Sequence, residues 1–169
     1  QLFLIAMLAI IVVAFVVYRI TVRPPSEDLS PEARVAAILD KGGCLDCHSA
    51  NPDLPFYADM PVIGDMVKTD AEEGYRAFDV VPLINALKNG ETPNPVDVAK
   101  VEKVAMDRSM PEAKYFLMHW GSQMTKAKAD IIADWAHNYR VAYYNDGLEG
   151  KRAGEPVRPI VAPSDINQE

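Results

Sequence analysis

The sequence has little cysteine and little histidine, with two and three of them among 169 residues. Both cysteines lie in one short run, Cys44-Leu45-Asp46-Cys47-His48, so none is left for a structural disulfide. The chain also lacks a glycine-rich phosphate loop and a nucleophile elbow. Its paired acidic residues, such as Glu72-Glu73, are typical of solvated helix surfaces. The sequence therefore offers no set of catalytic residues.

A cluster of basic residues is also absent. The whole chain carries a formal charge of −7, and residues 1–23 contribute +2 through Arg19 and Arg23, so the remainder carries −9. This acidic remainder excludes nucleic acid as an expected partner. Alternating apolar and polar residues, the pattern of a strand, are scarce, and no internal repeat is visible. We therefore predict an all-α fold.

The longest apolar run lies at the start of the chain. Residues 2–18 contain no charge, glycine or proline, and as a helix they would extend about 25 Å, close to the hydrocarbon thickness of a bilayer. The following residues, 19–25, offer no small-x-small cleavage site, which favours a transmembrane anchor over 1–20 and not a signal peptide. Arg19 and Arg23 follow this run, and the positive-inside rule alone would place them in the cytoplasm.

The remaining chain divides into a linker over 21–30, a helical domain over 31–149 and a proline-containing tail over 150–169, which would be a linker to a missing domain or a free tail. Ser30-Pro31 predicts the start of the first soluble helix, whose inward residues would be Val35, Ile38 and Leu39. The further expected helices cover 70–77 (weakly), 80–90, 94–108, a short aromatic segment ending at Gly121, and 125–144.

The cysteine run is the most informative motif. Two thiols separated by two residues lie about one helical turn apart, which suits attachment to the two vinyl groups of one porphyrin. The adjacent imidazole can then bind the iron, so Cys44 and Cys47 are the predicted attachment sites of haem c, and His48 the predicted proximal ligand. A thioredoxin-like redox pair would need a βαβ context, and a zinc site would need two more cysteines or histidines nearby. Neither context is present.

The second axial ligand is less constrained by sequence, because several methionines and two histidines follow the motif. We favour Met110, which precedes Pro111 at a break between helices, where a non-helical backbone can present the thioether. Met60, His119 and a position with water or no ligand remain alternatives. Thioether ligation favours electron transfer, whereas an open position permits ligand binding.

Aromatic residues gather around the expected site. Phe56, Tyr57 and Tyr115 are predicted to contact the haem and to exclude water from it. Phe116, Trp120 and Trp135 are further candidates, and ordinary core packing is an equally good interpretation of any one of them.

These features together resemble a bacterial haem-binding domain family with a single Cys-x-x-Cys-His run. The matching features are residues 44–48, the proline and aromatic stretch 51–57, Met110-Pro111, Tyr115 and His119, and the likeness covers about 28–143. Members often have histidines after the aromatic stretch, where this chain has Asp65-Met66-Val67. The resemblance implies a small cytochrome c-like domain around one covalent haem, on the periplasmic face of a bacterial inner membrane.

In some bacteria a domain of this family forms the N-terminal part of membrane-anchored cytochrome c peroxidases, before a di-haem catalytic region. Our first functional prediction is one-electron transfer from a quinol-linked donor to a downstream acceptor, such as a di-haem peroxidase domain. The alternatives are that the chain is the electron-relay part of a peroxidase that reduces hydrogen peroxide, or a haem-based sensor with an exchangeable ligand.

Overall fold

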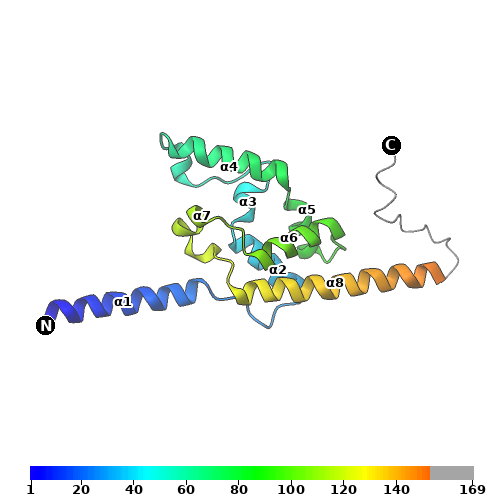
Figure 1. Ribbon diagram of the computed structural model, residues 1–169, viewed down its shortest axis with the longest axis horizontal. Helices are drawn as coiled ribbons and strands as arrows, with labels where there is room; N and C mark the ends of the chain where they lie inside the picture. Colours follow the sequence, from blue (N-terminus) through cyan, green and yellow to red (C-terminus); the bar gives the residue numbers. More distant parts are fainter. Residues whose placement is uncertain (153–169) are drawn as a thin grey trace. The chain divides into compact units, whose positions relative to one another are not determined.

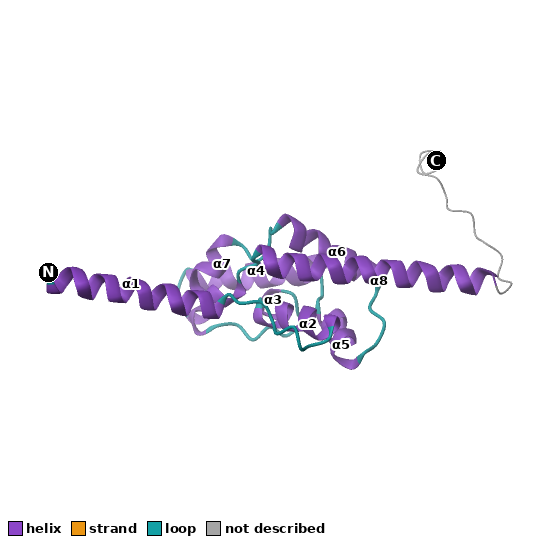
Figure 2. Ribbon diagram, turned by 90° about the horizontal axis from the view of Figure 1, so that it is seen from below, coloured by secondary structure: helices purple, strands orange, loops and turns teal. Residues whose placement is uncertain are grey.

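The computed structural model describes residues 1–152, without the side chains of Leu2, Phe116, Leu117 and 146–152. Described residues form α-helices and short 3-10 helices joined by loops, with no strand among them (Figure 2). The predicted all-α class is therefore confirmed. One compact unit comprises Gln1–Ala136, and a second begins at His137. Residues 153–169, most of the predicted tail, lie outside the described part.

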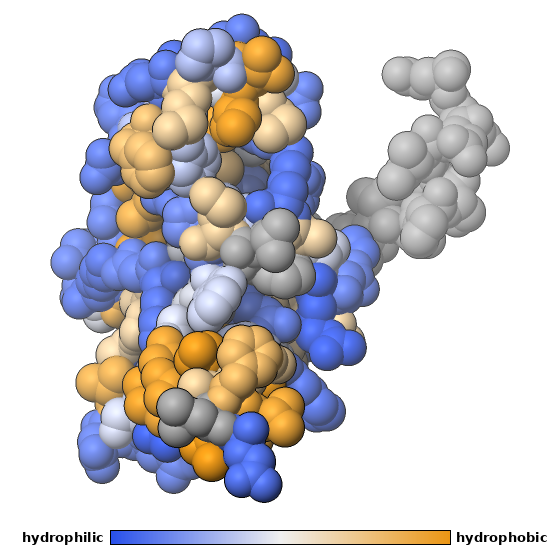
Figure 3. Space-filling view, turned by 90° about the vertical axis from the view of Figure 1, so that its left-hand side faces the viewer, coloured by the Kyte–Doolittle hydropathy of each residue, from blue (hydrophilic) through white to orange (hydrophobic). Residues whose placement is uncertain are grey.

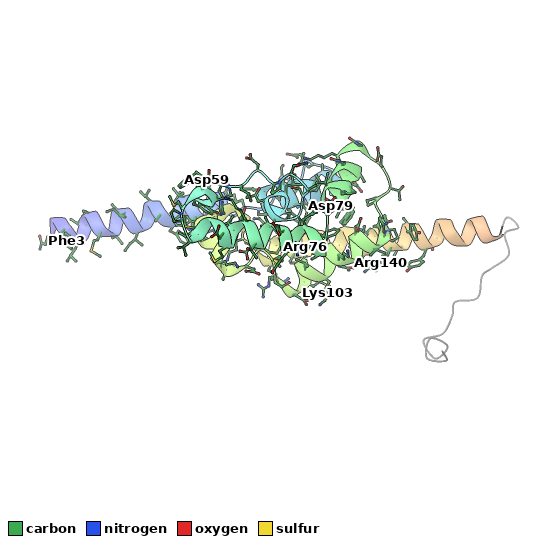
Figure 4. The ribbon with its side chains drawn as sticks, turned by 90° about the horizontal axis from the view of Figure 1, so that it is seen from above. Phe3, Asp59, Arg76, Asp79, Lys103 and Arg140 are labelled. Atoms are coloured by element: carbon green, nitrogen blue, oxygen red, sulfur yellow. The ribbon has the colours of Figure 1, made fainter. Side chains whose placement is uncertain are left out.

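The first helix, α1, spans Leu2–Thr21 (Figure 1). None of the residues in its apolar stretch Phe3–Thr21 is buried, and Figure 4 shows the Phe3 side chain projecting from the helix. By length and composition this helix could cross a membrane. Near the C-terminal end of α1, the Tyr18 hydroxyl donates to Gln123 Oε1 at 2.5 Å, so this end of the helix contacts a segment far along the chain.

Helices α2 (Pro31–Lys41) and α5 (Val81–Asn89) form the centre of the core. The Ser30 hydroxyl accepts a hydrogen bond from the Ala33 amide at 3.2 Å, as expected for an N-cap before a proline. The predicted inward residues of α2 are indeed buried. The core residues of the pair are Val35, Ile38, Leu39, Leu83, Ile84 and Leu87. At the surface, Lys88 Nζ lies 2.6 Å from Asp40 Oδ2.

The later part of the chain forms α6 (Pro95–Asp107), α7 (Ala113–Met118) and α8 (Lys126–Arg152), with a 3-10 turn, η2, at Trp120–Ser122. The α6 residues that face the core are Val98, Val101 and Ala105. The first part of α8 buries Ala129, Ile132, Trp135 and Ala136. Trp135 is thus a core residue, in agreement with ordinary core packing.

Two predicted helix boundaries are wrong. The helix expected over 70–77 is α4, which begins at Ile63 and ends at Ala77, after a 3-10 turn η1 at Phe56–Asp59. Its start has no side-chain cap, since Val62 stands at the N-cap position, so the usual signal is missing. Helix α8 runs to Arg152 instead of ending near Tyr144, because Gly147 and Gly150 do not interrupt its backbone.

Candidate functional site

The cysteine motif forms its own short helix. Helix α3 spans Cys44–Cys47, and the His48 amide donates to the Cys44 carbonyl at 2.8 Å, which closes one helical turn. The two thiols therefore project one turn apart, the spacing that the motif predicts. Gly43 precedes the helix in the left-handed conformation, with φ of 71°. This glycine allows the chain to turn sharply between α2 and α3.

The electrostatic surroundings of the two thiols favour their neutral form. Burial, followed by the charges of Asp46 and Asp40, raises the pKa of Cys44 to about 12. Burial also raises the pKa of Cys47. A reactive dithiol of the thioredoxin type needs a lowered pKa, so that the thiolate forms near neutral pH. The raised pKa values of both thiols therefore disfavour a redox-active cysteine pair.

The imidazole of His48 is oriented by the backbone. Its Nδ1 lies 2.9 Å from the Phe78 carbonyl oxygen, which fixes Nδ1 as the protonated nitrogen and leaves Nε2 available to a metal. The Val80 amide donates to the His48 carbonyl at 2.9 Å, so the segment between α4 and α5 binds both the ring and the backbone of His48. Sequence reasoning missed Phe78, because a backbone carbonyl 30 residues away leaves no signal in side-chain identity.

A second group of contacts joins the motif to α7. The Tyr115 hydroxyl donates to the Asp46 carboxylate, and its ring stacks on His119 with centroids 4.3 Å apart. Tyr57 approaches the same imidazole at 6.0 Å between ring centroids. Burial and the hydrogen bond to Asp46 raise the pKa of Tyr115 far above its ordinary value, so the phenol stays protonated. Tyr57, Tyr115 and His119 thus form one aromatic cluster beside α3.

Helix α4 closes another side of the motif. A Cβ added at Gly74 would lie 2.5 Å from the Cys47 carbonyl oxygen, so only glycine permits this close packing of α4 on α3. Lys114 of α7 reaches Asp70 of α4 at 2.8 Å. The motif is therefore enclosed by α4, α7 and the segment that begins at Phe78.

The other predicted site residues are more exposed. Met110 lies between α6 and α7, precedes Pro111 through a cis peptide bond and is 39% exposed, and Met60 at the end of η1 is 45% exposed. No contact places either thioether against His48, so axial ligation by Met110 stays a prediction. Phe56 is 76% exposed and meets only the edge of Tyr57 among the ring contacts described.

The fit of a haem can be judged from the exposed apolar side chains near the motif. Segments η1, α4, α7 and η2 leave several large apolar side chains in contact with solvent, and Figure 3 shows part of this apolar surface at the end of the domain where η1 and α4 meet. These residues are Met60, Val62, Ile63, Met66, Met118 and Trp120. A porphyrin needs apolar side chains around its ring, and these segments offer them in exposed positions. The residues present fit a haem.

Comparison with known proteins agrees with this fit. The model of the family described as "Haem-binding domain" matches residues 8–138. Cytochrome c peroxidase Ccp of Escherichia coli (strain K12) is 30% identical over 135 residues, which are 78% of this chain and 29% of that protein. The chain thus spans less than a third of the length of this curated relative. No solved structure matches. The family match covers most of the chain and includes the whole motif, so the chain belongs to the haem-binding domain family.

Proposed function

We propose that this chain is a membrane-tethered, mono-haem c-type cytochrome domain that carries out one-electron transfer. The observation that carries the proposal is the geometry of residues 44–48. Two cysteines one turn apart precede a histidine whose Nδ1 is bound to the Phe78 carbonyl, so that Nε2 is the free nitrogen. This is the arrangement that a covalently held porphyrin with an axial imidazole requires.

Each residue has a definite part in this proposal. Cys44 and Cys47 would supply the thioether sulfurs that hold the haem, and His48 Nε2 and Met110 Sδ would bind its iron. The bound haem supplies an iron that exchanges one electron, at a potential that thioether ligation raises. The Phe78 carbonyl keeps His48 in one orientation and tautomer. Tyr57 and Tyr115 exclude water from the side of the motif next to α7.

The membrane part of the proposal rests on α1. Its exposed apolar surface would anchor the chain as a single-pass protein of a bacterial inner membrane, with the haem domain on the periplasmic face. We place the domain there because c-type haem is attached on that side. A tether of this kind would hold the domain near a quinol-linked donor in the membrane and near a downstream acceptor.

A second candidate function is favoured by the relative in Escherichia coli. That protein is named a cytochrome c peroxidase and is more than three times as long as the matched segment. Our chain would then be the electron-relay part of such an enzyme, passing electrons to a di-haem peroxidase domain that reduces hydrogen peroxide. A reading frame that continues beyond Glu169 with two more Cys-x-x-Cys-His runs would support this candidate. A frame that stops there would exclude it.

The haem part of the proposal is tested by visible spectroscopy. The full chain should give a pyridine haemochrome spectrum of haem c at one haem per chain. Met110→Ala should abolish the weak near-infrared band of sulfur-to-iron ligation, whereas the matched control Met60→Ala should keep it. An unchanged band in Met110→Ala would refute this ligand assignment. Rapid stoichiometric binding of carbon monoxide to the reduced wild type would instead support the sensor function and contradict electron transfer.

A further inference from the structure

A small cavity lies where the C-terminal end of α1 meets the soluble domain. Its volume is about 190 Å³, whereas a single water molecule needs only about 15 Å³. The cavity lies between the segment after α1, the last turn and a half of α2 and the first turn of α8. Three of its lining residues are cationic, Arg23, Lys41 and Lys128, and none is acidic. A cluster of positive charge is unexpected in a chain with a net charge of −7.

The three cations come from distant parts of the sequence, and two of them lie against the segment 121–123. Lys128 is 2% exposed, and its Nζ donates to the carbonyl oxygens of Gly121 and Gln123 at 2.8 and 2.9 Å. The Lys41 side chain passes Gly121 closely, since a Cβ added there would lie 3.5 Å from Lys41 Cε. The domain therefore fixes the Lys128 ammonium beside this cavity.

Among the side chains that the structure describes, no carboxylate balances the charge of these cations. None of the ion pairs between those side chains includes Arg23, Lys41 or Lys128. The two described acceptors of the Lys128 ammonium are neutral carbonyl oxygens, so neither supplies a negative charge to balance it. Burial, and after it the nearby positive charge of Lys41, lowers the pKa of Lys128 to about 8. An anion in the cavity would relieve this repulsion.

The position of the cavity indicates which anion it takes. Arg23 lies two residues after the end of α1, so a membrane-spanning α1 would place the cavity at the level of the lipid headgroups. Pro24, Pro25 and Ile38 give the cavity an apolar wall beside its cations. Arginine and lysine are the residues that bind phosphate groups most often.

We infer that the cavity between the segment after α1, α2 and α8, lined by Arg23, Lys41 and Lys128, is a binding site for the phosphate group of an anionic membrane lipid. The inference rests on the tethering part of the proposed function, and it is independent of haem ligation. Such a site explains why arginines follow α1 on the side that the positive-inside rule disfavours. It would also hold an acidic domain against an anionic membrane surface that otherwise repels it.

The test uses the full haem-loaded chain in a zwitterionic detergent. Binding of phosphatidylglycerol and of diacylglycerol with the same acyl chains is measured by native mass spectrometry. We expect phosphatidylglycerol adducts that weaken about tenfold in Arg23→Gln and in Lys41→Gln, since each loses a charged contact to phosphate. The matched control Lys103→Gln removes an exposed lysine of α6, labelled in Figure 4, and should bind like wild type. Equal adducts with diacylglycerol, or an equal loss in the control, would overturn the inference.

A second arm separates a lipid headgroup from a soluble phosphate. If millimolar inorganic phosphate without lipid raises the thermal midpoint of the wild type and not of Lys41→Gln, while phosphatidylglycerol has no effect, the ligand is soluble and the lipid assignment is wrong. Flotation with liposomes tests the α1 anchor separately, and the visible spectrum tests the haem. The lipid measurement is made in detergent, so its result can still be interpreted if the anchor or the haem proposal fails.

Discussion

The replacement Gly43→Ala tests whether the approach to the motif depends on a tyrosine on another helix. Gly43 has φ of 71°, and a Cβ there would lie 2.0 Å from Tyr115 Oη and 2.8 Å from Tyr115 Cζ. The tyrosine cannot move away freely, because its hydroxyl donates to Asp46 and its ring stacks on His119. The methyl group must therefore displace Tyr115 and break contacts that join α7 to α3.

The expected cost has two parts. A left-handed conformation of a non-glycine residue costs about 1 kcal/mol. Loss of the hydrogen bond to a charged and partly buried Asp46 adds about 2 kcal/mol, for a total of about 3 kcal/mol. A matched control is Gly90→Ala, since Gly90 has φ of 70° and nothing within 4 Å of the added Cβ. It should cost only the conformational part, about 1 kcal/mol.

Thermal unfolding of the haem-loaded domain, followed by circular dichroism, measures this difference. At about 4 °C for each kcal/mol in a domain of this size, the midpoint should fall by about 12 °C in Gly43→Ala and about 4 °C in Gly90→Ala. In a Tyr115→Phe background the effect of Gly43→Ala should shrink, because the closest atom of the clash is gone. Equal losses at the two glycines, or additive effects with Tyr115→Phe, would refute the reasoning.

Three further predictions concern stability. The raised pKa of Tyr115 means that the unfolded state loses its phenol proton first, so stability falls above about pH 10, and Tyr115→Phe should lessen this fall in urea titrations at rising pH. For Lys128 the folded pKa of about 8 lies below the ordinary 10.5. Between pH 8 and pH 10.5 the unfolded state binds more protons than the folded state, so the free energy of unfolding should rise with pH through this group. In Lys128→Met this rise should be lost in denaturant titrations at several pH values. A rise that persists in the variant would contradict the assignment. Leu83→Ala, in the α2–α5 core, should cost about 2–5 kcal/mol in chemical denaturation, whereas Val96→Ala at an exposed site of α6 should cost about 0.5 kcal/mol, and similar values for both would count against the described core.

Much of this protein was readable from local patterns. The anchor-like run 2–18, the N-cap at Ser30 and the stop at Gly90 follow from composition, capping chemistry and backbone preference, which act over a few residues. The cysteine motif likewise indicates haem attachment without any knowledge of the fold, and the family match agrees with a haem cofactor. Dependence on local signals also explains why the start of α4 was missed. Val62, at the N-cap position, provides no side-chain cap that would mark the beginning of a helix.

The tertiary structure decided what lies around that motif. The Phe78 carbonyl that orients His48, and the Tyr115 hydroxyl that binds Asp46, come from segments 30 and 69 residues away. The meeting of Arg23, Lys41 and Lys128 at one cavity likewise depends on the path of the chain. No periodicity or spacing in the sequence encodes such approaches, because they arise from how the helices pack and not from the preferences of neighbouring residues. The sequence by itself determined the all-α class, most helix boundaries and the haem motif, and the packing of α2, α4, α7 and α8 determined the environment in which that motif acts.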